Sequence, residues 1–299
     1  MPATDTLLGT IDLNRILSGG QLPALLQSAL RLLELWRGPD NGPRELAVPI
    51  ESDPGLASQV LRYVNSSYFG FSHEISTVRL ALTLVGVRTI KSFILWSAVF
   101  SSIPDPKCGP FDLKQAWQDS LRRALFARAV AKVSGVKEAE ESFSAALLQD
   151  VALPLLASAA PQVYVKLLEE RGRVAVRLSD LERRSFGWTH AEAGGAVCRQ
   201  WNLPERLAVL VENHLEMDWR IGATKKDPDA AAVALSALLP SAVDATWTER
   251  ELFERWYGRI VPSGRPQIAD LFGEVDRQYA ELAPVLKLPL QSQALTDLY

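Results

Sequence analysis

PIESDPGLASQVLRYVNSSYFGFSHEISTVRLALTLVGVRTIKSFILWSAVF, residues 49–100, is the stretch that decides the fold class of this chain. Asp53 is a favourable N-cap because its carboxylate can accept the unpaired backbone N–H groups of a first helical turn. Pro54 suits the first helical position, where no N–H is needed. Apolar residues then recur at helical spacing, and the polar run 65–67 predicts the end of this helix.

The second half of the stretch predicts two further helices. Ser76 or Thr77 is the expected start of the first, and Gly86 separates it from the second, which continues with apolar residues at helical spacing to Trp96. An aromatic loop, residues 68–71, lies between the first and second helices of the stretch. We expect its rings to fill the gap between helices, because buried aromatic side chains contribute strongly to a core.

The rest of the chain also shows helix-start residues followed by apolar residues at helical spacing. The fold class is therefore predicted to be all-α. No alternating strand pattern of any length occurs. Three prolines within residues 101–110 predict a boundary between two packed helical bundles. We therefore expect a lead-in over 1–20, an N-terminal bundle over 21–103 and a second bundle over 104–299. Further helices are predicted over 22–35, 44–51, 111–134, 138–149, 151–159, 161–171, 179–186, 189–201, 204–214 and 267–283.

Composition excludes several functional classes. The chain has 299 residues, 47% of them hydrophobic and 22% charged, which is ordinary for a globular protein. A net charge of −3 argues against a dedicated nucleic-acid-binding protein, which needs a strong cationic field. No signal-peptide pattern begins the sequence, and no run of about 20 apolar residues suggests a membrane span. We expect a cytoplasmic protein.

Several landmarks together resemble the HDOD domain, a bacterial signalling module related to the HD metal-dependent phosphohydrolases. They are Leu22-Pro23, the run 50–53 with Pro54, the run 61–65 with Ser66 and Tyr68, and the run 76–86, and they occur in the family's order. The resemblance implies an N-terminal bundle specific to the HDOD branch, packed on an HD-like bundle.

The same resemblance locates the residues of a possible site. An HD phosphohydrolase has a histidine where this chain has Asp119, and a His-Asp pair where this chain has Gln149-Asp150. Its metal-binding pattern is thus broken at both histidines, as the HDOD resemblance implies. His190 and His214 are similar to later histidines of the cyclic-dinucleotide phosphodiesterases.

Asp119, Asp150, His190 and His214 could therefore face one cleft, as a remnant metal site or as hydrogen-bonding bridges between helices. We favour the bridges, because a hydrolytic site needs its full ligand set open to water. No catalytic residue, metal or cofactor is expected, and which residues would bind a ligand stays open.

Other polar residues are interpreted as ordinary structure. The arginines 122, 123 and 128 are expected on a solvated helix face rather than at a phosphate site. Cys198 is predicted to be a core residue and Cys108 to be exposed. Thr248 and Glu251 have the spacing of a capping box.

The leading functional hypothesis is a non-catalytic regulatory protein that contacts protein partners in trans. One alternative is a metal-dependent phosphohydrolase or cyclic-nucleotide phosphodiesterase with an altered ligand set. Another is an effector that binds a nucleotide without hydrolysing it. A homodimer is possible through the amphipathic helix predicted over 267–283.

Overall fold

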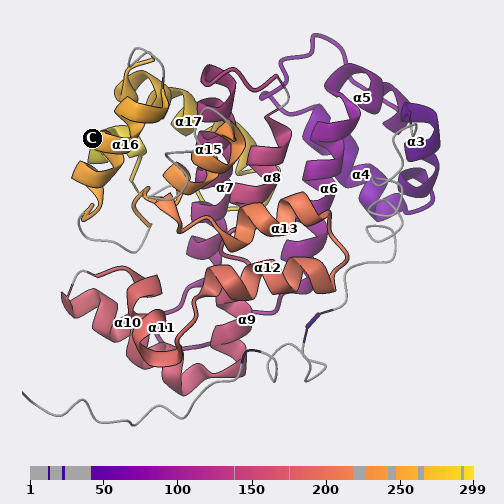
Figure 1. Cartoon of the computed structure of the whole chain (residues 1–299). Helices are drawn as coiled ribbons and strands as arrows, with labels where there is room; N and C mark the ends of the chain where they lie inside the picture. Colours follow the sequence, from indigo (N-terminus) through magenta and orange to yellow (C-terminus); the bar gives the residue numbers. More distant parts are fainter. Residues whose placement is uncertain are drawn as a thin grey trace, which may run out of the picture.

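The computed structural model describes residues 13, 22–23, 42–137, 139–174, 176–217, 227–241, 247–261, 266–290 and 293–299. Within these ranges every regular element is a helix, which confirms the predicted all-α class (Figure 1). The lead-in and the helix predicted over 22–35 lie almost entirely outside the described residues. The helices are α3 (Pro43–Glu51), α4 (Pro54–Val64), α5 (Val78–Val85), α6 (Val87–Ser102), α7 (Leu113–Val133), α8 (Glu140–Leu148), α9 (Ala152–Ala159), α10 (Pro161–Val174), α11 (Leu178–Phe186), α12 (His190–Gln200), α13 (Glu205–Glu212), α15 (Pro228–Ser236), α16 (Arg250–Ile260), α17 (Ile268–Leu282) and α18 (Leu295–Leu298).

The predicted helix starts of the opening stretch are confirmed. The Asp53 carboxylate accepts the backbone N–H of Leu56 at 3.0 Å and begins α4. Thr77 accepts the backbone N–H of Leu80 at 3.2 Å and begins α5. Each bond satisfies a donor that the first helical turn leaves unpaired.

Asn65 closes the aromatic loop between α4 and α5. Its side-chain N–H groups donate to the carbonyls of Leu61 and Ile75, both at 2.9 Å. Its side-chain oxygen accepts the backbone N–H of Ile75 at 2.7 Å. One amide side chain thus joins the end of α4 to the segment that enters α5.

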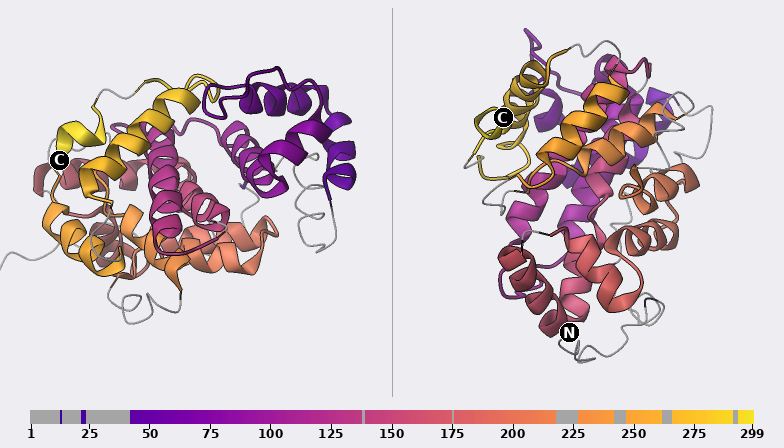
Figure 2. Two further views of the ribbon diagram at one scale, coloured as in Figure 1. Left: turned by 90° about the horizontal axis from the view of Figure 1, so that it is seen from above. Right: turned by 60° about the vertical axis from the view of Figure 1, so that its left-hand side comes forward.

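The central helices α7 and α8 separate the N-terminal helices from the C-terminal ones (Figure 2). Helix α6 packs on α8, where the buried hydroxyls of Ser92 and Ser144 lie 2.7 Å apart. One hydrophobic core runs from Leu46 to Leu295 through both parts. Residues 103–112 connect α6 to α7 without a helix, as the prolines predicted. That a domain boundary lies there stays a prediction.

The arginines of α7 are not on a solvated face, so that prediction was wrong. Arg122 and Arg128 are each only 3% exposed. Arg128 donates to the Tyr68 hydroxyl and to Gln278 at 3.1 Å, and it pairs with Glu140 at 3.4 Å. These partners come from the aromatic loop, α17 and α8, so a buried cation joins distant parts of the chain.

Three smaller predictions were also wrong. Cys108 is buried, and its thiol contacts the carbonyl of Pro161 at 3.2 Å. Helix α11 begins at Leu178 rather than after a cap at residue 179 or 180. Thr248 forms no capping box, because its hydroxyl donates to its neighbour Glu249 at 2.9 Å.

Two apolar helical segments pack against other parts of the chain. The stretch Glu140–Ala159 is long and apolar enough to cross a membrane, but 83% of its most apolar window is buried, as in a core helix. Helix α17 packs its apolar face on α7, burying Phe272 and Val275 among others. That face is therefore used within the chain, and the homodimer stays a prediction.

Candidate functional site

Three side chains from separate elements meet in the second half of the molecule. Asp150 lies in the turn between α8 and α9, His190 is the first residue of α12, and His214 follows the end of α13. All three are buried. One ligand atom from each lies within 4.8 Å of the others. We call these three residues the Asp150 cluster.

Close packing of α12 on α13 brings the two histidines together. A Cβ added at Gly195 would lie 2.6 Å from Cβ of Glu212, and one at Gly194 would lie 2.9 Å from a methyl carbon of Val211. Glycine is therefore needed at both positions for the helices to approach. The rings of His190 and His214 lie 5.3 Å apart, centroid to centroid.

Asp150 is surrounded by nitrogen atoms. Its Oδ2 pairs with a guanidinium nitrogen of Arg123, from α7. Its Oδ1 lies 3.3 Å from Nε2 of His190 and 3.7 Å from Nε2 of His214. Burial alone would raise the pKa of Asp150, but Arg123 and His190 outweigh burial and hold this pKa well below its ordinary value. Asp150 is an anion at neutral pH.

His190 lies between two carboxylates. Its Nδ1 is 2.6 Å from Oε2 of Glu182, a fully buried residue of α11, and its Nε2 faces Asp150. Burial would lower the pKa of His190, but Glu182 and Asp150 outweigh it and raise this pKa to about 9. Glu182 also accepts the Tyr164 hydroxyl and the backbone N–H of His190, both at 2.9 Å.

His214 has the opposite electrostatic character. Its Nδ1 lies 2.7 Å from the carbonyl oxygen of Val211. A carbonyl can only accept, so Nδ1 carries the hydrogen and Nε2 is an unprotonated acceptor. Burial lowers the pKa of His214 to about 3, against the opposing effect of Asp150. The ring is therefore neutral at pH 7.

The two residues that replace the HD histidines make their own hydrogen bonds. The Asp119 carboxylate accepts the hydroxyl of Ser241. The amide oxygen of Gln149 accepts the hydroxyl of Ser236 at 3.1 Å. The Gln149 Nε2 is buried and has no hydrogen-bond partner among the described residues.

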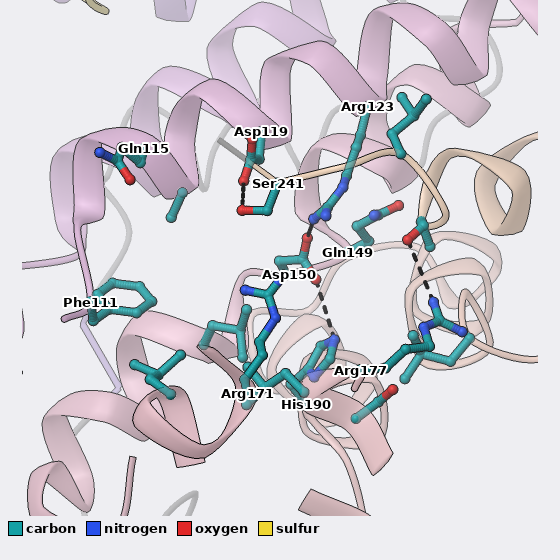
Figure 3. Close-up of a pocket in the computed structure, with 18 of the residues that line it drawn as sticks. Phe111, Gln115, Asp119, Arg123, Gln149, Asp150, Arg171, Arg177, His190 and Ser241 are labelled. Atoms are coloured by element: carbon teal, nitrogen blue, oxygen red, sulfur yellow. Dashed lines mark hydrogen bonds and ion pairs between the residues drawn. The ribbon is translucent and has the colours of Figure 1, made fainter. Parts of the chain in front are cut away.

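A cavity of about 130 Å³ connects these groups (Figure 3). All four predicted residues, Asp119, Asp150, His190 and His214, line it. Asp119 lies on the cavity wall but outside the Asp150 cluster. Arg123 descends from α7 onto Asp150, while Arg171 and Arg177 reach the cavity from α10 and the start of α11.

Sequence reasoning missed two residues of the site. Arg123 lies four residues after Asp119 on α7, so helical spacing placed it on the same face. Glu182 carried no such signal, because its contact with His190 depends on the turn between α11 and α12. The pairing of Glu182 with His190 can be recognised only once the relative positions of α11 and α12 are known.

These observations define a class: an all-helical protein with a buried cluster of one aspartate and two histidines beside a cavity. The family model of the HDOD domain matches residues 22–217. The chain belongs to the HDOD domain family.

Comparisons with individual proteins agree with this assignment. A protein of Treponema pallidum (strain Nichols) is 28% identical over 199 residues, which are 65% of this chain but only 37% of that protein. An HDOD domain protein from Geobacter sulfurreducens shares the fold with a TM-score of 0.73 at 21% identity, covering 91% of this chain and 96% of that one.

Two further solved structures share the fold alone. A proposed signal-transduction protein from Marinobacter aquaeolei VT8 has a TM-score of 0.71 at 20% identity, covering 95% of this chain and 63% of that one. A proposed phosphohydrolase from Shewanella amazonensis SB2B has a TM-score of 0.64 at 19% identity, covering 95% and 94%.

Proposed function

We propose that this chain is a non-catalytic regulatory protein that works by contact with other proteins. The observation that carries this proposal is the pairing of Arg123 with Asp150. Asp150 is the one residue of the HD ligand pattern that the chain keeps, and a guanidinium is already bound to it. A phosphohydrolase needs such a carboxylate to hold a metal ion that activates water.

The charges of the cleft support the same conclusion. The anions Asp150 and Glu182 are balanced by the cations Arg123 and His190. Loss of one partner of a buried ion pair strongly destabilises the folded protein, because the other charge is left buried without a counter-charge. The network therefore holds together α7, α11, α12 and the α8–α9 turn. Its charged side chains stabilise the fold rather than serve a reaction.

Exposed apolar side chains in the N-terminal helices support contact with a partner. Leu80 and Leu84 are 41% and 50% exposed and lie one turn apart on α5. Val48 on α3 and Phe71 in the aromatic loop are exposed in the same part of the chain. Apolar side chains gathered on a surface are typical of sites where another protein binds.

Hydrolysis assays test the non-catalytic part of the proposal. The full chain is assayed with a phosphomonoester, a linear phosphodiester and cyclic dinucleotides, each with added Mn²⁺ or Zn²⁺. We expect no turnover above that of the Asp150→Asn variant. Turnover that needs the metal ion and is lost in Asp150→Asn would refute the proposal.

The convergence of Asp150, His190 and His214 favours one alternative, a phosphohydrolase with an altered ligand set. The same assay decides between the two. An effector that binds a nucleotide in the cavity would instead give calorimetric heat with cyclic dinucleotides and no turnover.

A further inference from the structure

The chain turns back after α17 and lies against that helix again. Residues 283–287 form the turn, and the described residues that follow are 288–290 and 293–299. We call these described residues the returning segment. It ends in the short helix α18, which packs on α17.

Side chains of α7 and α17 hold the main chain of the returning segment. Gln118 of α7 and the hydroxyl of Tyr279 of α17 both donate to the carbonyl of Pro289, at 3.2 and 3.0 Å. Arg122, one helical turn after Gln118, donates to the carbonyl of Gln293 at 2.9 Å. Every residue type has a backbone carbonyl. Another extended chain can therefore accept the same bonds.

Asp276 of α17 holds the start of α18. Its carboxylate accepts the backbone N–H of Leu295 at 3.0 Å and that of Thr296 at 3.1 Å. The Thr296 hydroxyl donates to the same carboxylate at 3.1 Å. The side chain of Leu295 is fully buried. The returning segment is thus recognised by main-chain contacts and one apolar anchor.

The four side chains Gln118, Arg122, Asp276 and Tyr279 form what we call the α7–α17 site. Gln118 is 7% exposed and Arg122 is 3% exposed, so their polar groups are buried while the returning segment is bound. A buried donor that loses its acceptor is costly. Release of the segment takes one carbonyl acceptor from each of them. The site is therefore suited to holding an extended chain.

The returning segment is held less firmly than the core helices. Leu295 is the one buried side chain among its described residues, while Leu290 is 65% and Tyr299 41% exposed. Segments with few buried apolar contacts open at a lower free energy than the core does. We therefore expect the segment to leave the α7–α17 site without unfolding of the helices around it.

We propose that the α7–α17 site docks an extended segment of a partner protein, and that the returning segment occupies the site in competition with it. The partner segment presents main-chain carbonyls to Gln118 and Arg122. It carries an aliphatic side chain at the position of Leu295. Recognition through the main chain gives affinity, and the pocket for one side chain gives specificity.

The tether of the returning segment favours a different protein over a second copy of this chain. A tethered segment is present at a high effective concentration, so it keeps out any ligand that makes only the same contacts. A second copy offers only those contacts. A partner segment gains more where it buries apolar side chains that Leu290 and Tyr299 leave exposed. This surface is separate from α5, and the two are tested separately.

Peptide binding to the full chain tests this inference. The probe is a fluorescein-labelled peptide that copies residues 287–299, and fluorescence anisotropy follows its binding. Leu295→Glu in the full chain places a charge in the apolar pocket and releases the tethered segment. The probe should therefore bind at least about tenfold more tightly to this variant than to wild type. Leu290→Glu is the matched control and should behave as wild type, because Leu290 is exposed in the same segment.

Two further changes show where the probe binds. A probe with the Leu295→Glu change should not bind, because it lacks the apolar anchor. Gln118→Ala, added to the Leu295→Glu chain, should weaken binding of the unchanged probe by about three- to tenfold, since it removes a hydrogen bond to the main chain of the probe.

Four results would overturn the inference. They are no binding by folded Leu295→Glu chain, checked by circular dichroism, and equal binding by wild type, Leu290→Glu and Leu295→Glu. The third is binding unchanged by Gln118→Ala or by the altered probe. The fourth is a wild-type dimer, seen by light scattering, that Leu295→Glu converts to a monomer, because the site would then hold a second copy of this chain.

Discussion

Asp150 is the residue on which the cleft depends. His190 is buried, the Arg123 side chain is 14% exposed, and both use Asp150 as counter-charge. Asp150→Ala should lower the free energy of unfolding by about 3–5 kcal/mol, because it leaves Arg123 without its carboxylate partner and leaves only Glu182 beside the buried His190. Urea unfolding followed by circular dichroism measures this change.

The control for Asp150→Ala removes a carboxylate that is solvated. Glu169 is exposed in the middle of α10, and Glu169→Ala should change stability by no more than about 0.5 kcal/mol. Equal effects of the two substitutions would contradict the role given to Asp150.

Only part of this site could be predicted from residues. The order of motifs along the chain placed Asp119, Asp150, His190 and His214 near one another, and all four line one cavity. Their partners could not be predicted in the same way. The sequence gives no sign that Arg123 pairs with Asp150, because this pairing depends on the tertiary packing of α7 against the α8–α9 turn.

At the scale of elements, the contact between α12 and α13 sets the spacing of the two histidines. Gly195→Ala forces a Cβ to within 2.6 Å of the Glu212 side chain. Overpacking of this kind should cost about 1–3 kcal/mol. Thermal or urea unfolding measures the loss.

Two other helical glycines are matched controls. Gly258 in α16 and Gly273 in α17 have no atom within 4 Å of an added Cβ. Alanine there should stabilise the chain by about 0.5–1 kcal/mol, because glycine is the poorer helix former. Stabilisation by Gly195→Ala as well would show that the helices can move apart without cost.

Helix starts were well predicted where one side chain alone provides the cap. Asp53 and Thr77 cap their helices as expected, and the Glu192 carboxylate accepts the backbone N–H of Thr189 at 2.7 Å at the start of α12. The prediction failed at Thr248, whose hydroxyl bonds to Glu249 instead. A local sequence pattern indicates which residues could cap a helix. Competition between hydrogen-bond partners in the folded chain then determines which capping bond forms.

At the scale of the whole molecule, Arg128 joins parts of the chain that lie far apart in sequence. It contacts Tyr68 near the N-terminal helices, Glu140 at the start of α8 and Gln278 on α17. Arg128→Ala should therefore cost about 3–5 kcal/mol in unfolding free energy. Denaturant unfolding measures it, with the exposed Arg62→Ala as control.

A loss no larger for Arg128→Ala than for Arg62→Ala would mean that the buried cation does not hold these parts together. The all-α class could be predicted from helix caps and apolar periodicity, while the separate N-terminal bundle stays a prediction. How the N-terminal and C-terminal helices pack together could not be predicted, because that depends on pairings such as Arg128 with Gln278, which are 150 residues apart.

The central claim is that the chain acts through contact, and capture of partners from a lysate of the source organism tests it most directly. Wild-type chain, Leu84→Glu and Val174→Glu serve as baits, since Leu84 and Val174 are similarly exposed at 50% and 49%. Quantitative mass spectrometry should find a protein at near one-to-one ratio on wild type and Val174→Glu that is lost on Leu84→Glu. No such protein on wild-type chain, or equal retention by all three baits, would contradict a contact surface on α5.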